Sequence, residues 1–139
     1  MTRINTIKPC KLTDQHLLAE HRELPRVFGQ AYDAYMAGRK VQASSRYTLG
    51  KGHVVFFYDK LEWLATRHRA LTSECVSRGF KVQQEPIVPP AEIQSVEWEP
   101  TAADMEVNLE RLRAKLAAPP RPNSYRYRGM PVPENWYDT

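Results

Sequence analysis

The chain has 139 residues, of which 42% are hydrophobic and 26% are charged, and its formal net charge is +4. This length allows one hydrophobic core, but not a nucleotide-binding unit together with a second domain. No apolar run approaches the roughly 18 residues that a membrane-spanning helix needs, and the polar N-terminus lacks the apolar segment of a signal peptide. The sequence therefore predicts a single globular domain that stays inside the cell.

Cysteine and histidine are too sparse for a metal or disulfide framework. The two cysteines, Cys10 and Cys75, are expected to be reduced, packed thiols, because cysteine is often buried and the cytosol is reducing. The histidines show no metal-ligand spacing, and Gly50-Lys51-Gly52 lacks the spacing of a phosphate-binding loop. His68 falls on an apolar stripe and is expected to be a satisfied core or boundary residue. We therefore expect neither a metal nor a cofactor.

A first helix is predicted over residues 14–37. Thr13 is a suitable N-cap, and Gly38 is a suitable stop. Between them, apolar or ring-bearing side chains recur every three or four residues. These are Leu17, His21, Leu24, Phe28, Ala31 and Tyr35. Pro25 interrupts the pattern and removes one backbone donor at a cost of about 3 kcal/mol, so the helix is expected to kink there.

Two further helices are predicted, over residues 59–78 and 102–117. Gly79 fits the left-handed position that ends the second helix, and Thr101 with Asp104 resembles a capping box for the third. Residues 54–58 could be a buried strand or an early start of the second helix, which leaves a sheet as the weaker alternative. Prolines over residues 81–100 and after residue 118 indicate irregular connections. The predicted fold class is all-α.

Charge is segregated along the chain. Residues 1–60 carry ten basic and five acidic residues, residues 61–110 carry four and nine, and residues 111–139 carry six and two. Two basic ends around an acidic middle indicate one surface that faces a polyanion such as nucleic acid. Chance clustering on a solvated surface is the alternative.

The polar face of the first helix is not explained by packing. Gln15, Arg22 and Arg26 lie within about 40° of one another around the helix, and His16 and Glu23 form an adjacent line. A solvated face with Glu–Arg pairs would have the same spacing. A carboxylate among arginines weakens DNA binding, however, so Glu23 on a DNA-binding face indicates a catalytic role.

The second residue, Thr2, offers a possible nucleophile. A small residue after Met1 permits removal of the initiator methionine, which would expose an α-amine with a pKa of about 7.7–8.0, against about 10.4 for lysine. At neutral pH the unprotonated form is then roughly 300-fold more populated than in lysine. Such an amine can attack a sugar carbon and form a Schiff base. An ordinary N-terminus is the alternative.

Three blocks of the sequence resemble the pyrimidine-dimer DNA glycosylases, the family of phage endonuclease V. They are Met1–Asn5 with Asp14–Leu17 and Ala19–Gly29; Leu49-Gly50 with Gly52–Val54 and Phe56–Glu62; and Glu74-Cys75 with Arg78–Phe80. The resemblance implies a single compact three-helix domain over residues 1–139, with the N-terminal segment packed between the helices. Three departures bear on lesion preference: Ser124 replaces a tryptophan, His21 replaces a tyrosine, and residues 131–139 form a C-terminal extension.

The resemblance also implies an activity. The protein would be a monomeric DNA repair enzyme that acts on ultraviolet-damaged double-stranded DNA in the cytoplasm of a cell or infected host. It would remove the 5′ base of a cyclobutane pyrimidine dimer and then nick the strand as an AP lyase. The alternatives are a glycosylase/AP lyase for another base lesion and a non-catalytic module that binds damaged DNA.

Matching positions assign the candidate site residues. The α-amine of Thr2 is the implied nucleophile, and Glu23 is the implied essential carboxylate, which stabilises positive charge at the sugar and moves protons. The implied DNA contacts are Arg3, Gln15, His16, Arg22 and Arg26 near the lesion, and Arg111, Lys115, Tyr125, Arg126 and Tyr127 towards the C-terminus.

Overall fold

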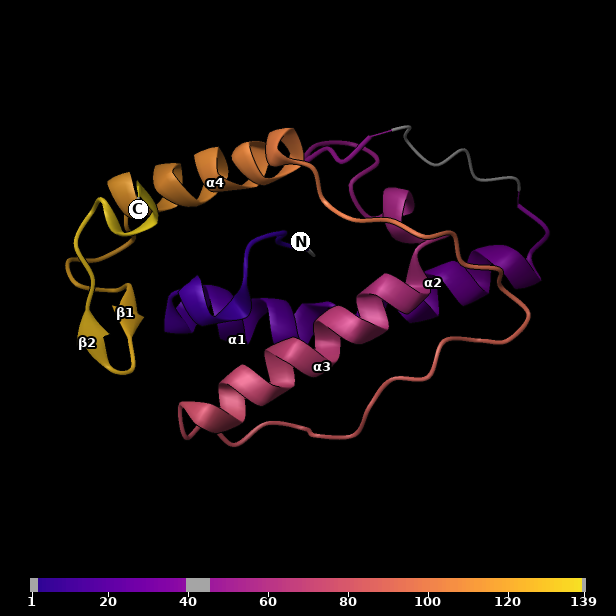
Figure 1. Ribbon diagram of the computed structural model, residues 1–139, viewed down its shortest axis with the longest axis horizontal. Helices are drawn as coiled ribbons and strands as arrows, with labels where there is room; N and C mark the ends of the chain where they lie inside the picture. Colours follow the sequence, from indigo (N-terminus) through magenta and orange to yellow (C-terminus); the bar gives the residue numbers. More distant parts are fainter. Residues whose placement is uncertain (1–2, 40–45, 139) are drawn as a thin grey trace.

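A computed structural model of the chain describes residues 3–39 and 46–138. Over these residues the fold is all-α apart from one two-stranded hairpin, which confirms the predicted fold class (Figure 1). Helix α1 (Asp14–Glu23) is followed at once by α2 (Pro25–Met36), and α3 (Leu61–Ser77) packs against α1. Helix α4 (Ala102–Ala117) lies across the N-terminal segment from α1. Among the described residues, no helix is both long and apolar enough to cross a membrane.

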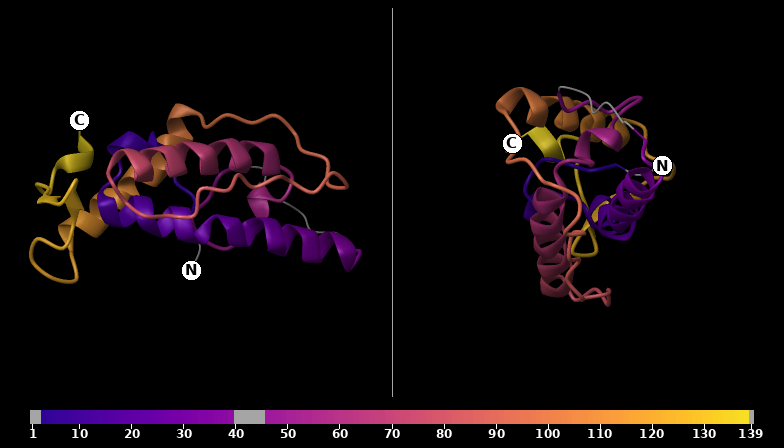
Figure 2. Two further views of the ribbon diagram at one scale, coloured as in Figure 1. Left: turned by 90° about the horizontal axis from the view of Figure 1, so that it is seen from below. Right: turned by 90° about the vertical axis from the view of Figure 1, so that its right-hand side faces the viewer.

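The helix expected over residues 14–37 is interrupted at Leu24, directly before Pro25, and is divided into α1 and α2. The two helices follow one another nearly in line (Figure 2). The Thr13 side chain caps α1 by accepting a hydrogen bond from the backbone N–H of His16 at 3.3 Å. Pro25 occupies the first position of α2, where its fixed φ suits the helix and a backbone donor is dispensable. Tyr35, which we expected on the buried stripe, is 50% exposed.

The ends of α3 and α4 follow the local signals in the sequence. Gly79 has φ +84°, and the backbone N–H of Phe80 donates to the carbonyl of Cys75 at 2.9 Å, which is the hydrogen bond of a Schellman motif. Thr101 and Asp104 form a reciprocal capping box at the start of α4. Both predicted helices are therefore confirmed, with α4 at the predicted bounds.

Two local features differ from what the sequence suggested. Residues 54–58 form neither of the two alternatives left open, a strand or an early start of the second helix, because Val55–Phe57 is a separate 3₁₀ turn, η2, that buries its two phenylalanine rings against the core. Cys10 is exposed, whereas Cys75 is buried as expected. The reason for the exposure of Cys10 is its place in η1 (Pro9–Lys11), a 3₁₀ turn on the surface with no buried residue.

A hairpin that was not predicted docks on the start of α1. Its strands, β1 (Arg126–Tyr127) and β2 (Met130–Pro131), pair antiparallel. The two turn residues, Arg128 and Gly129, both have positive φ, as a two-residue type I′ turn requires. Their backbone N–H groups donate to the Asp14 carboxylate at 3.0 and 2.9 Å. The hairpin is thus attached to the fold by an acidic residue at a helix N-terminus.

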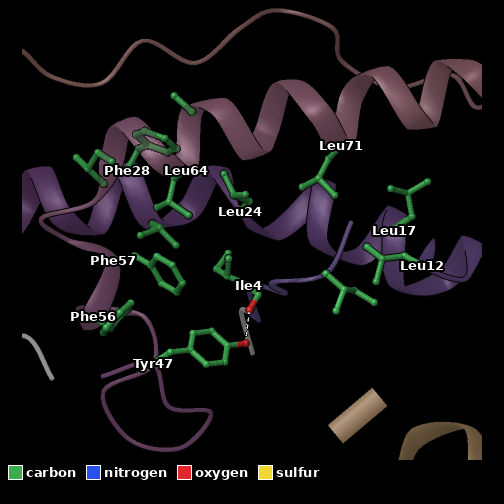
Figure 3. Packing of buried hydrophobic residues seen from close by; sticks show 14 of the residues in the cluster. Ile4, Leu12, Leu17, Leu24, Phe28, Tyr47, Phe56, Phe57, Leu64 and Leu71 are labelled. Atoms are coloured by element: carbon green, nitrogen blue, oxygen red, sulfur yellow. Dashed lines mark hydrogen bonds between the residues drawn. The ribbon is translucent and has the colours of Figure 1, made fainter. Parts of the chain in front are cut away.

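One hydrophobic cluster connects the N-terminal segment, the four helices, η2 and the last turn, η3 (Trp136–Asp138). Its fully buried members include Ile4, Leu12, Leu17, Leu24, Phe57, Leu61, Leu64, Leu71 and Leu112. Ile4 lies within the cluster, and the hydroxyl of Tyr47 donates to its carbonyl oxygen at 2.7 Å (Figure 3). The N-terminal segment is therefore packed between the helices, as expected.

Candidate active site

Glu23 lies at the junction of α1 and α2. It is the last residue of α1, and the buried Leu24 separates it from Pro25 at the start of α2. Its side chain is 15% exposed, and one carboxylate oxygen lies 3.9 Å from a guanidinium nitrogen of Arg22. Arg22 and Arg26 are exposed residues on either side of the junction. The local sequence thus places a mostly buried carboxylate between two solvent-exposed cations.

Arg111 on α4 connects Glu23 electrostatically with the N-terminal segment. Burial lowers the pKa of Arg111, and the positive charge of Arg3 lowers it further. Tyr47, Tyr125 and Glu23 act in the opposite direction. Arg3 and Glu23, which lie on two other segments, are therefore both within electrostatic range of Arg111.

Hydrogen bonds to three other parts of the chain hold the N-terminal segment that precedes η1. The backbone N–H of Ile4 donates to Nε2 of His53 at 2.8 Å, and its carbonyl accepts from the Tyr47 hydroxyl. Two residues further on, the backbone N–H of Thr6 donates to Oδ1 of Asn108 on α4 at 2.8 Å. These bonds fix the backbone two residues after Thr2.

A buried ion pair between α1 and α3 also binds the N-terminal segment. The guanidinium of Arg67 on α3 binds both carboxylate oxygens of Glu20 on α1, at 2.8 and 2.9 Å. The same carboxylate accepts from the side-chain amide of Asn5 at 2.8 Å, and Arg67 also donates to the carbonyl of Ile7. The sequence pattern did not single out Glu20, Arg67 or Asn5 as a cluster. Two features of the sequence could have indicated the pair. Glu20 is an acid on the buried side of the predicted helix 14–37, and Arg67 is a base next to the apolar stripe of the predicted helix 59–78.

His53 is locked in one neutral form. Its Nδ1 lies 2.7 Å from the carbonyl of Thr48, which can only accept, so Nδ1 carries the proton and Nε2 accepts from Ile4. Burial lowers the pKa of His53 to about 4, and the charges of Arg3 and Arg111 contribute, against the hydrogen bond to Thr48. The anchor of the N-terminal segment is therefore uncharged at neutral pH.

His16 lies among several residues from the C-terminal part of the chain. Its ring stacks on Tyr125 with centroids 4.9 Å apart. Burial lowers the pKa of His16 to about 4, and the nearby charges of Arg111 and Lys115 lower it further. Lys115 itself is exposed. The structure thus gathers four of the sequence-predicted DNA contacts into one cluster.

Gln15, Arg126 and Tyr127 already have partners within the fold. Gln15 accepts a hydrogen bond from the backbone N–H of Arg126 at 2.8 Å. The hydroxyl of Tyr127 donates to the carbonyl of Cys10 at 2.7 Å, and its ring lies 4.2 Å from the guanidinium of Arg78. Arg126 is exposed. Gln15 and Tyr127 therefore help to dock the hairpin, and their contact with DNA stays a prediction.

A pocket opens beside the α1–α2 junction. It has a volume of about 660 Å³ and is lined by Leu18, His21, Arg22, Pro25, His68, Val82, Gln83, Glu85, Pro86 and Ile87. The rings of His21 and His68 stack at 4.8 Å, and burial lowers the pKa of both. His68 is buried as expected, but its Nδ1 has no hydrogen-bond partner among the residues that the structure describes, so it is not fully satisfied there. This pocket shares Arg22 with the surroundings of Glu23.

Thr2, the expected nucleophile, lies outside the described residues, so its position relative to Glu23 stays a prediction. Within the described ranges, no three histidine, cysteine or acidic side chains come together as a metal site requires.

A family model described as pyrimidine dimer DNA glycosylase matches residues 1–87, well over half of the chain. The match contains the Glu23 junction, the Glu20–Arg67 pair and the pocket residues. The chain therefore belongs to the pyrimidine dimer DNA glycosylase family.

Proposed function

We propose that this protein is a pyrimidine-dimer DNA glycosylase with AP lyase activity, which acts as a single domain and a monomer on ultraviolet-damaged duplex DNA. After removal of Met1, the α-amine of Thr2 attacks C1′ of the 5′ nucleotide of the dimer. The glycosidic bond breaks, and its electron pair leaves with the base, which takes up a proton. Loss of an amine proton and opening of the sugar ring then give an imine at C1′.

Strand nicking follows from the same imine. A base removes the proton at C2′, the C3′–oxygen bond breaks, and its electron pair leaves with the 3′ phosphate. Hydrolysis of the imine by water frees the amine. We assign Glu23 to the stabilisation of positive charge at the sugar and to the proton transfers, since it is the carboxylate at the α1–α2 junction.

The observation that carries this proposal is the surroundings of Glu23. A carboxylate that is 15% exposed lies near Arg22 and is an electrostatic neighbour of Arg111, which is also near Arg3. Arg3 follows Thr2 directly in the sequence. Cations of this kind bind DNA phosphates, whereas the acid contributes nothing to affinity for a polyanion. A catalytic role explains why it is there.

The pocket beside the junction supports duplex distortion. We propose that it receives the base opposite the lesion, which must leave the helix when the duplex is kinked. A pyrimidine dimer weakens pairing with that base, so the cost of flipping it is lower than in undamaged DNA. The pocket is lined by apolar side chains and stacked imidazoles, and its position next to Arg22 puts it beside the proposed catalytic carboxylate.

Borohydride trapping tests the proposal. Protein without Met1 is incubated with a duplex that contains one defined dimer, and reduction of the imine should leave a covalent adduct that mass spectrometry places on Thr2. Protein that retains Met1 is the matched control and should give no adduct. Duplexes with an oxidised purine or an abasic site separate a glycosylase for another lesion from the proposed one. Binding without any adduct on all three duplexes would instead show a non-catalytic module.

A further inference from the structure

The C-terminal extension reaches the start of α1 through Tyr137, which is buried. The hydroxyl of Tyr137 accepts a hydrogen bond from the backbone N–H of Thr13 at 2.9 Å. The same hydroxyl lies 2.8 Å from Nδ1 of His16, and Oγ1 of Thr13 lies 3.0 Å from that nitrogen. Residues 121 positions apart in the chain thus share one hydrogen-bonded cluster around an imidazole nitrogen.

The pattern of donors around His16 assigns its neutral form. Each of the two hydroxyl groups carries one proton that needs an acceptor, and both oxygens already accept a backbone N–H, from Thr13 and from His16 respectively. Nδ1 has a single lone pair, and the Tyr137 hydroxyl lies closer to it, at 2.8 Å, than Oγ1 of Thr13 does. If Nδ1 carried the proton instead, the Tyr137 hydroxyl would have no acceptor among the described residues, because its other partner is the N–H of Thr13. Nδ1 is therefore the unprotonated nitrogen, and the proton of the neutral ring is on Nε2.

The other ring nitrogen is a donor without an acceptor. Among the described residues, Nε2 of His16 is buried and has no hydrogen-bond partner. Arg111 and Lys115 are close enough to act on the charge of the ring. A buried N–H next to two cations is a suitable donor for an anionic oxygen. The phosphate oxygens of DNA are acceptors of this kind.

We propose that Tyr137 is a positioning residue that holds His16 as the neutral Nε2–H form, so that this N–H donates to a phosphate oxygen of bound DNA. This inference rests on the proposed function, since it assumes that DNA lies over Arg111 and Lys115. Because Nε2 is buried, this hydrogen bond requires that side chains around the ring, such as the stacked Tyr125, move when DNA binds. The family model ends at residue 87, so the role belongs to a part of this chain outside the match.

Nitrogen-15 NMR of the DNA-free protein, taken from pH 7 down to pH 5, tests the assignment directly. In the wild-type protein the His16 ring should show a protonated Nε2 and a bare Nδ1 throughout this range. In the Tyr137→Phe variant the pKa of His16 should rise, because the hydroxyl that donates to Nδ1 is gone. A wild-type ring with its proton on Nδ1 would overturn the proposal without any variant.

Binding to a duplex with a tetrahydrofuran abasic analogue, which cannot be cleaved, tests the consequence. Tyr137→Phe should weaken binding by about threefold to tenfold, the net worth of one ordinary hydrogen bond. In a His16→Ala background, Tyr137→Phe should change the affinity by less than about twofold, because Tyr137 then has no imidazole to position. Trp136→Phe is the matched control. It removes another tail hydrogen bond, from the indole N–H to the carbonyl of Lys11, and should leave binding and the His16 spectrum unchanged.

The two proposals fail in different ways. Equal affinity of the wild-type protein for damaged and undamaged duplex would contradict the proposed function, whatever the state of His16. A preference for the damaged duplex, together with an effect of Tyr137→Phe that persists in the His16→Ala background, would show a merely structural role of Tyr137 and overturn this inference alone.

Discussion

The guanidinium of Arg67 binds both carboxylate oxygens of Glu20 inside the fold, with nitrogen–oxygen distances of 2.8 and 2.9 Å. The side chains are 5% and 0% exposed, so the pair has lost nearly all of its water. Removal of one partner leaves the other charge buried and unpaired. The main effect of such a pair is therefore to hold the groups around it in one arrangement, and here these groups include the segment that precedes α1.

Replacement of Arg67 by methionine should lower the free energy of unfolding by about 3–5 kcal/mol, because the Glu20 carboxylate stays buried without its partner. Urea unfolding followed by circular dichroism measures the change. The matched control is Arg69→Met on an exposed position of the same helix, which should change stability by less than about 0.5 kcal/mol. Equal losses in the two variants would mean that the ion pair does not support the fold.

Replacement of Glu23 by glutamine should separate binding from chemistry. The side chain keeps its shape but can no longer accept a proton, so base removal and nicking should slow by about 10²–10⁴-fold. Affinity for the damaged duplex should be retained, since loss of a negative charge does not oppose DNA binding. Single-turnover cleavage and a binding titration measure the two effects. Glu62→Gln on the exposed first turn of α3 should cut normally, and an active Glu23→Gln enzyme would rule out the assigned role.

The stability of the protein should fall as the pH is lowered from about 6.5 towards 4. Burial lowers the pKa of all four histidines, His16, His21, His53 and His68. Because their unfolded-state pKa is near 6.5, the unfolded chain binds protons first as the pH falls, and unfolding becomes more favourable. For His53, with a folded-state pKa of about 4, the loss between pH 7 and pH 5 is about 2 kcal/mol.

The His53→Gln variant isolates this contribution. A glutamine can still offer an acceptor to Ile4 but does not titrate, so its stability should change less between pH 7 and pH 5 than that of the wild-type protein. Urea midpoints at the two pH values measure the difference. Parallel pH dependences in the two proteins would show that His53 is not the group that titrates.

Replacement of Asp14 by asparagine should loosen the hairpin. The carboxylate accepts from the backbone of Arg128 and Gly129 and from the guanidinium of Arg78 at 2.9 Å, and an amide offers only one oxygen for these donors. A loss of about 1–3 kcal/mol and faster hydrogen exchange at residues 128 and 129 are expected. Asp33→Asn, on an exposed position of α2, is the control and should alter neither. Unchanged exchange in Asp14→Asn would show that the hairpin is held elsewhere.

Local signals in the sequence were sufficient for the helices. Thr13, Pro25, Gly79 and the Thr101–Asp104 pair each act on backbone groups within four residues, so their effect does not depend on the rest of the fold. The same holds for the position of Glu23 at a helix junction that Pro25 imposes. The 3₁₀ turn η2 was ambiguous for the opposite reason, since a short apolar run fits several conformations until its neighbours are known.

The sequence by itself determined the three helical regions, the Pro25 break, and the resemblance that singled out Glu23 and the basic residues. Only the tertiary structure decided that Glu20 pairs with Arg67, that Arg111 comes near Glu23, and that Tyr137 lies against His16. The physical reason is range. Helix geometry repeats every 3.6 residues and is visible in a short window, whereas a buried polar pair forms between segments whose separation along the chain carries no information about their contact.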